Sequence, residues 1–112
     1  GTMAEHSCDG RQVMLYAITG TDGPDSLPGR LAARAAHLAR VTALRDQGRL
    51  VIAGPHPCLD TSEPGTAGFS GSLIVAEFAS LQEAESWANA DPYVESGVWA
   101  EVRVKPFIQV LP

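Results

Sequence analysis

The sequence is poor in cysteine, in basic residues and in long apolar runs, and each shortage excludes a class of protein. Two cysteines in 112 residues are too few for a disulfide framework. Eight basic residues against thirteen acidic ones give a net charge of −5, which argues against nucleic acid or an anionic membrane as a partner. No apolar run approaches the roughly 20 residues of a membrane-spanning helix. The composition, 45% hydrophobic and 19% charged, is that of a globular protein.

The first twelve residues, GTMAEHSCDGRQ, carry little that predicts structure. They lack the continuous apolar segment of a secretory signal, and Gly1 and Thr2 ahead of Met3 are typical of a cloning remnant. We expect residues 1–12 to be a flexible extension and residues 13–112 to form one domain. We also expect the protein to be cytoplasmic and Cys8 to be unpaired with Cys58.

Four segments have the pattern of β-strands. Three are short apolar runs bounded by glycine or proline, and the fourth alternates apolar with polar residues, as a half-buried strand does. They are VMLYAITG (13–20), RLVIAGP (49–55), SLIVAEF (72–78) and VWAEVRVKPFIQVL (98–111).

Two segments have the pattern of helices. Residues 30–47 end at Gly48, a plausible C-cap. Residues 81–90 follow Ser80, which forms an S-x-x-E capping box with Glu83. The order β-α-β-β-α-β predicts an α+β, ferredoxin-like fold, an antiparallel sheet with both helices on one face.

The predicted sheet is apolar on both faces. In the first strand both alternating sets of side chains are largely apolar, and the third strand repeats this pattern. A sheet of this kind needs a cover on each face, and the chain has no spare helix. We therefore predict a homodimer packed sheet to sheet.

The stretch RAAHLARV (34–41) places one histidine, His37, in the first predicted helix. At 100° per residue His37 falls within a broad apolar arc, and Arg30 and Arg34 fall just outside it. The residues of that arc are Leu31, Leu38, Val41 and Leu44. His37 is then either a core histidine with a structural hydrogen bond or an acid–base group that a carboxylate orients.

The best candidate for that carboxylate is Asp91 in ADPYVESG, because it closes the second helix, which lies on the same sheet face. Asp-Pro is also an ordinary stop signal after a helix. Asp22, Asp25 and Asp60 lie in predicted loops and are equally available. Periodicity alone therefore leaves the choice open.

Residues 56–71 form a long connection rich in proline and glycine, and long loops in compact domains are often functional lids. His56, Cys58 and Asp60 alternate within it, but no second cluster completes the four ligands of a structural zinc site. We expect no metal site.

Several stretches taken together resemble the YciI family of small bacterial proteins. They are RAAHLARV, GRLVIAGPHP, AGFSGSLIVAEFASLQEAESWANADPYVESGV and VKPF, which span Met14 to Phe107. The resemblance implies a dimeric α/β barrel with a pocket centred on an acid–base pair. The pair falls on His37 and Asp91. Further positions that match the family's pocket are Arg34, Ser72, Gly54 and Tyr93.

The resemblance further implies a lyase or isomerase that needs no cofactor and acts on a small molecule with an acidic C–H. Dehydrochlorination of chlorinated hydroquinones is one activity associated with the wider family. From its spacing of one turn from His37, we expect Arg34 to hold a carboxylate or enolate oxygen. Two alternatives stay open: a module that binds or senses a ligand without turnover, and a haem or cofactor-free monooxygenase of the same fold group.

Overall fold

A computed structural model describes residues 13–112, and the predicted extension of residues 1–12, with Cys8, lies outside the described residues. Four strands form one antiparallel sheet in the order β2-β3-β1-β4. Their bounds are β1 (Met14–Asp22), β2 (Leu50–Pro57), β3 (Phe69–Phe78) and β4 (Trp99–Phe107). This order, with the two predicted helices as crossovers, is the ferredoxin-like arrangement, so the predicted fold class is confirmed.

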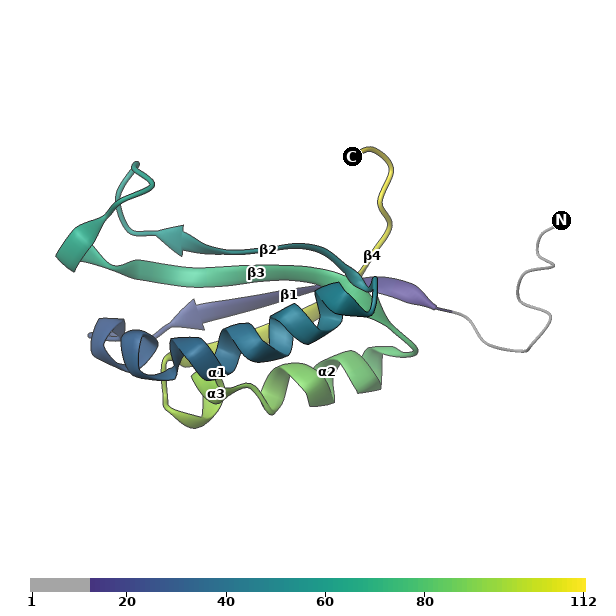
Figure 1. The fold of residues 1–112 in the computed structure, drawn as a ribbon, viewed down its shortest axis with the longest axis horizontal. Helices are drawn as coiled ribbons and strands as arrows, with labels where there is room; N and C mark the ends of the chain where they lie inside the picture. Colours follow the sequence, from purple (N-terminus) through teal and green to yellow (C-terminus); the bar gives the residue numbers. More distant parts are fainter. Residues whose placement is uncertain (1–12) are drawn as a thin grey trace, which may run out of the picture.

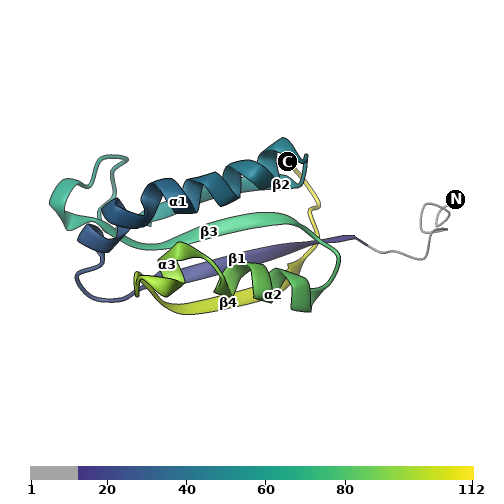
Figure 2. The ribbon, with the colours of Figure 1, turned by 60° about the horizontal axis from the view of Figure 1, so that its bottom comes forward.

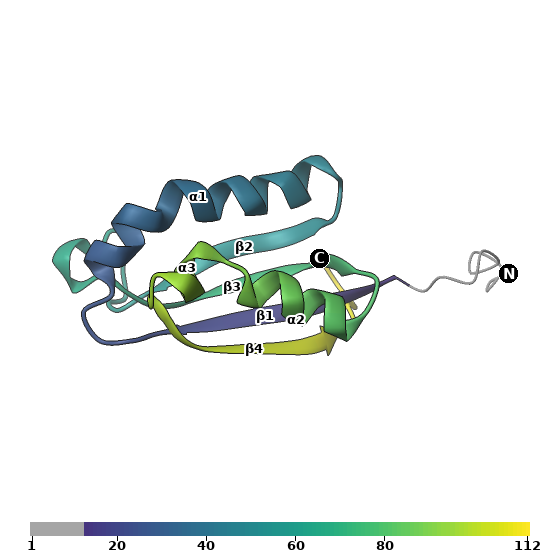
Figure 3. The ribbon, with the colours of Figure 1, turned by 90° about the horizontal axis from the view of Figure 1, so that it is seen from below.

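The helices all lie on one side of the sheet (Figure 1). They are α1 (Leu27–Asp46), α2 (Leu81–Asn89) and the one-turn α3 (Pro92–Glu95), and a 3-10 turn, η1 (Gly65–Ala67), interrupts the connection between β2 and β3. Helix α1 runs alongside β2, whereas α2 and α3 lie over β4 (Figure 3). This arrangement leaves α1 and α3 next to each other, which matters for the site described below.

The core fills the space between the sheet and these helices. Ile18 of β1 and Ile74 of β3 are register partners and are fully buried beneath the helices. Tyr16 and Phe78 meet edge to face at a centroid separation of 6.3 Å. Since side chains alternate along a strand, the residues between these positions point to the opposite face of the sheet.

That opposite face has no cover among the described helices, which all lie on the other side of the sheet (Figure 1) and in front of it in Figure 2. By register, Leu15, Ala17, Leu73 and Val75 lie at its centre and Ile52 at its β2 edge. On β4 the same face carries charged residues, Glu101, Arg103 and Lys105, opposite Thr21, Thr19 and Ala17. The two apolar faces predicted for the central strands are therefore present in the structure.

Several predicted boundaries are wrong by a few residues. Helix α1 begins at Leu27 rather than at residue 30, because Pro28 sits in the first turn, where its missing N–H is no loss. Strands β2 and β3 extend to Pro57 and back to Phe69, which shortens the connection from 56–71 to 58–68. Strand β4 ends at Phe107, which already pairs with Leu15 at the beginning of β1.

The orientation predicted for α1 was wrong at three residues. Leu31 and Leu38, placed in the apolar arc, are 67% and 38% exposed, whereas Arg30, placed outside it, is only 5% exposed. The buried residues of the helix are Arg30, His37, Val41 and Leu44, a spacing of seven, four and three. Helix α1 thus directs a guanidinium and an imidazole toward the sheet. The caps of the helices agree with prediction, since Ser80 Oγ accepts from Glu83 N–H and Gly48 adopts a positive φ of 73° after α1.

Candidate active site

A cavity of about 230 Å³ opens between α1 and the β2–β3 edge of the sheet, with α3 at one side. It contains every residue that the sequence placed in the pocket except Asp91, which lies directly behind His37. The lining residues are Arg30, Arg34, His37, Leu38, Val41, Ala53, Gly54, Pro55, Ser72, Ile74 and Tyr93.

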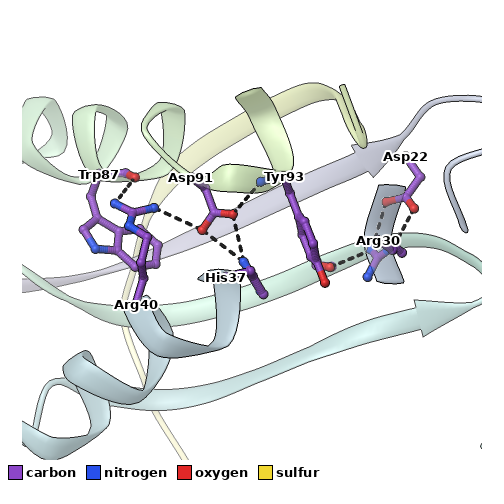
Figure 4. A network of polar contacts seen from close by, with 8 residues as sticks. Asp22, Arg30, His37, Arg40, Trp87, Asp91 and Tyr93 are labelled. Atoms are coloured by element: carbon purple, nitrogen blue, oxygen red, sulfur yellow. Dashed lines mark hydrogen bonds and ion pairs between the residues drawn. The ribbon is translucent and has the colours of Figure 1, made fainter. Parts of the chain in front are cut away.

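The structure brings His37 and Asp91 into contact (Figure 4). His37 Nδ1 lies 2.9 Å from Asp91 Oδ1 and 3.0 Å from Oδ2. Asp91 is fully buried and His37 is 7% exposed. Because an ionised carboxylate only accepts hydrogen bonds, this contact places the proton on Nδ1 and leaves the lone pair on Nε2.

Asp91 is held in this position by the local sequence ADPY. The residue before a proline avoids the helical region, and Asp91 has an extended backbone, with φ −69° and ψ 141°. It caps α3, and its Oδ1 accepts from Tyr93 N–H at 2.9 Å. The prediction that Asp91 closes the second helix is thus wrong in detail: α2 ends at Asn89, and Asp91 begins the next helix.

Arg40 is the second cation on Asp91, and the sequence did not single it out. Its Nη1 donates to Asp91 Oδ2 at 3.0 Å and its Nη2 donates to the carbonyl of Trp87 at 2.8 Å. The guanidinium also lies 4.3 Å from the centre of the Trp87 ring. The available signal was its position three residues after His37, on the same side of the helix.

Two aromatic rings fix the plane of the His37 imidazole. Tyr93 stacks on it at 4.1 Å and 14°, and Trp99 meets it edge to face at 5.6 Å. Burial raises the pKa of the Tyr93 hydroxyl above its ordinary value, while the charges of Arg30 and Arg34 oppose that rise. At neutral pH the Tyr93 hydroxyl is therefore protonated and able to donate.

Arg30 and Asp22 form a second buried ion pair at the other side of Tyr93 (Figure 4). Arg30 Nε and Nη2 donate to the two oxygens of Asp22 at 2.6 and 2.9 Å. Nη2 also donates to Ser72 Oγ at 2.8 Å and to the carbonyl of Gly71 at 2.9 Å. Asp22, one of the carboxylates left open by the sequence, is thus the partner of Arg30 and not of His37.

The accessible atoms show which groups face the cavity. Within residues 13–112, Trp99 Nε1 is the one fully buried side-chain nitrogen or oxygen without a hydrogen-bond partner. His37 Nε2 has no partner among the described residues either, so it keeps accessible surface, and it opens into the cavity that His37 lines. The free nitrogen of the His–Asp pair therefore faces the space where a ligand fits.

The other predicted residues divide between the cavity and elsewhere. Gly54 and Ser72 form part of the wall, and Arg34 lies at the exposed edge. His56 is on β2 rather than in a loop, and by register it points to the open face of the sheet. Asp25 and Cys58 line a separate hollow of about 560 Å³, beside the connection 58–68. None of the residues of that connection lines the His37 cavity.

Residues 13–112 contain neither a cluster of metal ligands nor a helix suited to span a membrane. Within residues 13–112, no group of three or more His, Cys, Asp or Glu side chains is placed to hold a metal ion. None of the helices there combines the length and the apolarity that crossing a membrane requires.

The sequence comparisons agree on the family. The model of the YCII-related domain matches residues 14–108. The chain belongs to the YciI family. It is 56% identical to Protein YciI of Escherichia coli O6:H1 over 97 residues, which is 87% of this chain and 99% of that protein. It is 50% identical, over the same shares, to an uncharacterised protein of Haemophilus influenzae.

One solved structure is similar in both sequence and fold. It is the 5-chloro-2-hydroxyhydroquinone dehydrochlorinase of Burkholderia phenoliruptrix, in complex with 2,5-dihydroxybenzoquinone. The match has a TM-score of 0.74 and 29% identity, and it covers 85% of this chain and 94% of that one. A similar fold is thus found in a dehydrochlorinase of a small ring compound.

Proposed function

We propose that this YciI-family protein is an enzyme that transfers a proton on a small molecule bound in the cavity, with His37 as the acid–base group. One observation carries the proposal: His37 Nδ1 is bound to a buried carboxylate, while Nε2 has no partner among the described residues and His37 lines the cavity. This is the arrangement of a general base whose tautomer is set from behind.

The chemistry follows from that arrangement. Nε2 takes a proton from an acidic C–H or O–H of the substrate, and the imidazolium that forms is stabilised by Asp91. In an elimination, the electron pair of the broken bond forms a new double bond as a leaving group departs with its own pair. In an isomerisation, Nε2 returns the proton at a different carbon. Asp91 acts through His37 and is a positioning residue.

The size of the cavity indicates the size of the substrate. A dry cavity of about 150 Å³ is known to hold benzene, so about 230 Å³ accommodates one six-membered ring with a few substituents. The similarity to a dehydrochlorinase supports elimination of chloride from a hydroquinone-like ring as the first reaction to test. The alternative function, a module that binds or senses a ligand, would use the same cavity but would not convert the ligand to a product.

The decisive experiment compares two histidines. Chloride release from chlorinated hydroxyhydroquinones, and proton exchange on small compounds with acidic C–H groups, are measured for wild type, His37→Asn and His56→Asn. Loss of general acid–base help should lower the rate by roughly 10²–10⁴-fold in His37→Asn. His56→Asn should match wild type, because His56 is on the other face of the sheet. Ligand binding without turnover in wild type, or full activity in His37→Asn, would favour the binding module.

A second copy of the chain is the proposed cover of the open sheet face. The apolar centre of that face is continuous with Ile52, which is 57% exposed. The segment after β4, with exposed Ile108 and Leu111, also runs to this side of the sheet (Figure 1). We expect a solution mass about twice the 11.8 kDa of the chain.

Light scattering after size exclusion tests this dimer. Ile52→Glu should yield a monomer, whereas Leu31→Glu, a somewhat more exposed position on the helix side, should leave the dimer intact. A wild-type mass of one chain, or dissociation by both variants alike, would contradict the proposal.

A further inference from the structure

Arg30 lines the cavity, yet its side chain is held in one orientation by several contacts. Its Nε and Nη2 are used by Asp22, and the remaining proton of Nη2 is directed at Ser72 Oγ and the Gly71 carbonyl. Its guanidinium also lies between two aromatic rings, 5.2 Å from the centre of Phe69 and 5.0 Å from that of Tyr93. These contacts fix the plane of the guanidinium before any ligand arrives.

One nitrogen of this group is left over. Within residues 13–112, Arg30 Nη1 has no hydrogen-bond partner, yet it is not among the fully buried unpartnered atoms. It therefore keeps accessible surface on a residue that is otherwise buried and lines the cavity. Nη1 carries two N–H donors and no acceptor, so it can be satisfied only by water or by an oxygen of a ligand.

The charges around the cavity sum to a positive value. The pairs Arg30–Asp22 and Arg40–Asp91 are each neutral overall. Arg34, at the exposed edge of the cavity, has no ion-pair partner among the described residues and leaves one positive charge unbalanced. Neither Asp22 nor Asp91 lines the cavity, and each accepts from an arginine, so neither faces a bound anion directly.

We infer that Arg30 and Arg34 form an anion subsite, and that the molecule bound beside His37 is a small planar monoanion: a carboxylate, phenolate or enolate. Its charged oxygen accepts from Arg30 Nη1, and Arg34 supplies the balancing charge at the edge of the cavity. The inference rests on the proposed function only in placing that molecule in the His37 cavity. It adds that Arg30 selects the substrate by charge, with Asp22 and Ser72 as its positioning residues.

The subsite also suits the proposed chemistry. Removing a proton from carbon sends its electron pair toward a neighbouring oxygen, where donors aimed in advance stabilise the charge. The Tyr93 hydroxyl, which is protonated and without a partner among the described residues, supplies a further donor from the same wall. Nε2 of His37 then accepts the proton, while Arg30 Nη1, Arg34 and the Tyr93 hydroxyl donate hydrogen bonds to the negative charge that forms.

Benzoate and benzamide test the inference, because they have nearly the same shape and differ by one charge. Binding of each is measured by NMR titration of backbone amides, which also reports whether each variant is folded. Wild type should bind benzoate at least about tenfold more tightly than benzamide. Arg34→Gln, a change at an exposed residue, should weaken benzoate by about tenfold or less, and Arg30→Lys should weaken it by more, since lysine lacks the fixed fork.

Arg45→Gln is the matched control, an exposed arginine at the far end of the same helix. It should leave both affinities unchanged. Equal binding of benzoate and benzamide by wild type, or benzoate binding unaffected in Arg34→Gln and in folded Arg30→Lys, would overturn the inference. His37→Asn should still prefer benzoate, so loss of turnover in that variant and loss of anion binding in the arginine variants separate the two proposals.

Discussion

Two buried carboxylates lie on either side of Tyr93, each bound to an arginine, and they serve different groups (Figure 4). Asp91 holds the Nδ1 of an imidazole whose Nε2 faces the cavity. Asp22 holds the Nε and Nη2 of a guanidinium whose Nη1 has no partner among the described residues, on a residue that lines the cavity. In both cases the carboxylate does not line the cavity itself, and it orients a side chain that has one nitrogen without a hydrogen-bond partner among the described residues.

The difference between the two sides lies in what that free atom does. At Asp91 it is a lone pair that accepts a proton, and at Asp22 it is a pair of N–H donors that bind negative charge. A third side chain, Tyr93, touches both groups, by stacking on His37 and by lying over Arg30. Proton abstraction needs a base and a group that stabilises the resulting negative charge. Asp91 orients the base, His37, and Asp22 orients the cation, Arg30.

The largest effect is expected on the Asp91 side. Asp91→Asn should lower the free energy of unfolding by roughly 3–5 kcal/mol, because the charge of Arg40 is then left beside an uncharged, fully buried amide. Urea unfolding measures the loss, and ¹⁵N NMR of His37 should show Nδ1 no longer held as the protonated nitrogen. Asp46→Asn is the control, an exposed carboxylate paired with Arg45, and should change stability by less than about 0.5 kcal/mol.

A somewhat smaller loss is expected on the Asp22 side. Asp22→Asn should cost roughly 3 kcal/mol, the lower end of the range for a broken buried pair, because Ser72 and the Gly71 carbonyl still accept from Arg30. The same urea experiment applies. His37 should keep its NMR tautomer in this variant; a changed tautomer would show that the two sides are not independent.

Gly20→Ala should disturb the Asp91 side while sparing Arg30. A Cβ at Gly20 would overlap ring carbons of Trp99, and Trp99 packs edge to face on His37. Overpacking of this kind costs about 1–3 kcal/mol, and it should shift the His37 imidazole signals in NMR. Gly23→Ala, whose Cβ meets only Ala100 at 3.4 Å and Gly97 O at 3.9 Å, should lose at most about 0.5 kcal/mol. Equal losses in both variants would refute the role of Trp99 packing.

The smallest effect concerns Tyr93 between the two sides. Burial raises its pKa above the ordinary value of 10.0, so the folded protein holds this proton more tightly than the unfolded chain does. The resulting stability is complete below about pH 10 and falls as the pH rises through the folded pKa. Urea unfolding from pH 9 to 11 should show a steeper decline in the free energy of unfolding for wild type than for Tyr93→Phe. Parallel curves would mean that the phenol is not desolvated.

The fold could be predicted because its signals are local. Alternation in the strands, the Ser80–Glu83 capping box and Gly48 after α1 each depend on a few neighbouring residues, and each is present in the structure. The boundaries that were missed depend on partners instead. Strand β4 ends where β1 begins, and β2 extends to Pro57 because β3 pairs with it.

The candidate site was only half predictable. His37 was found from its position on the helix, and Asp91 and the cavity residues Arg34, Gly54, Ser72 and Tyr93 from the family resemblance. Arg30, Arg40 and Asp22 were not assigned to it. Arginines on a helix usually point to solvent. No local sequence pattern shows that a carboxylate from elsewhere in the chain lies where a buried arginine can pair with it.

What the sequence by itself determined about this protein is the set of strands and helices, the apolar character of both sheet faces and the family to which the chain belongs. These depend on side-chain periodicity and on short motifs, which act over a few residues. Only the tertiary structure decided which carboxylate serves which cation. Asp91 lies 54 residues from His37 and 51 from Arg40, and Ser72 lies 42 from Arg30. A buried charge is stable only when a partner is held against it, and the packing of α1 against the sheet and α3 supplies those partners.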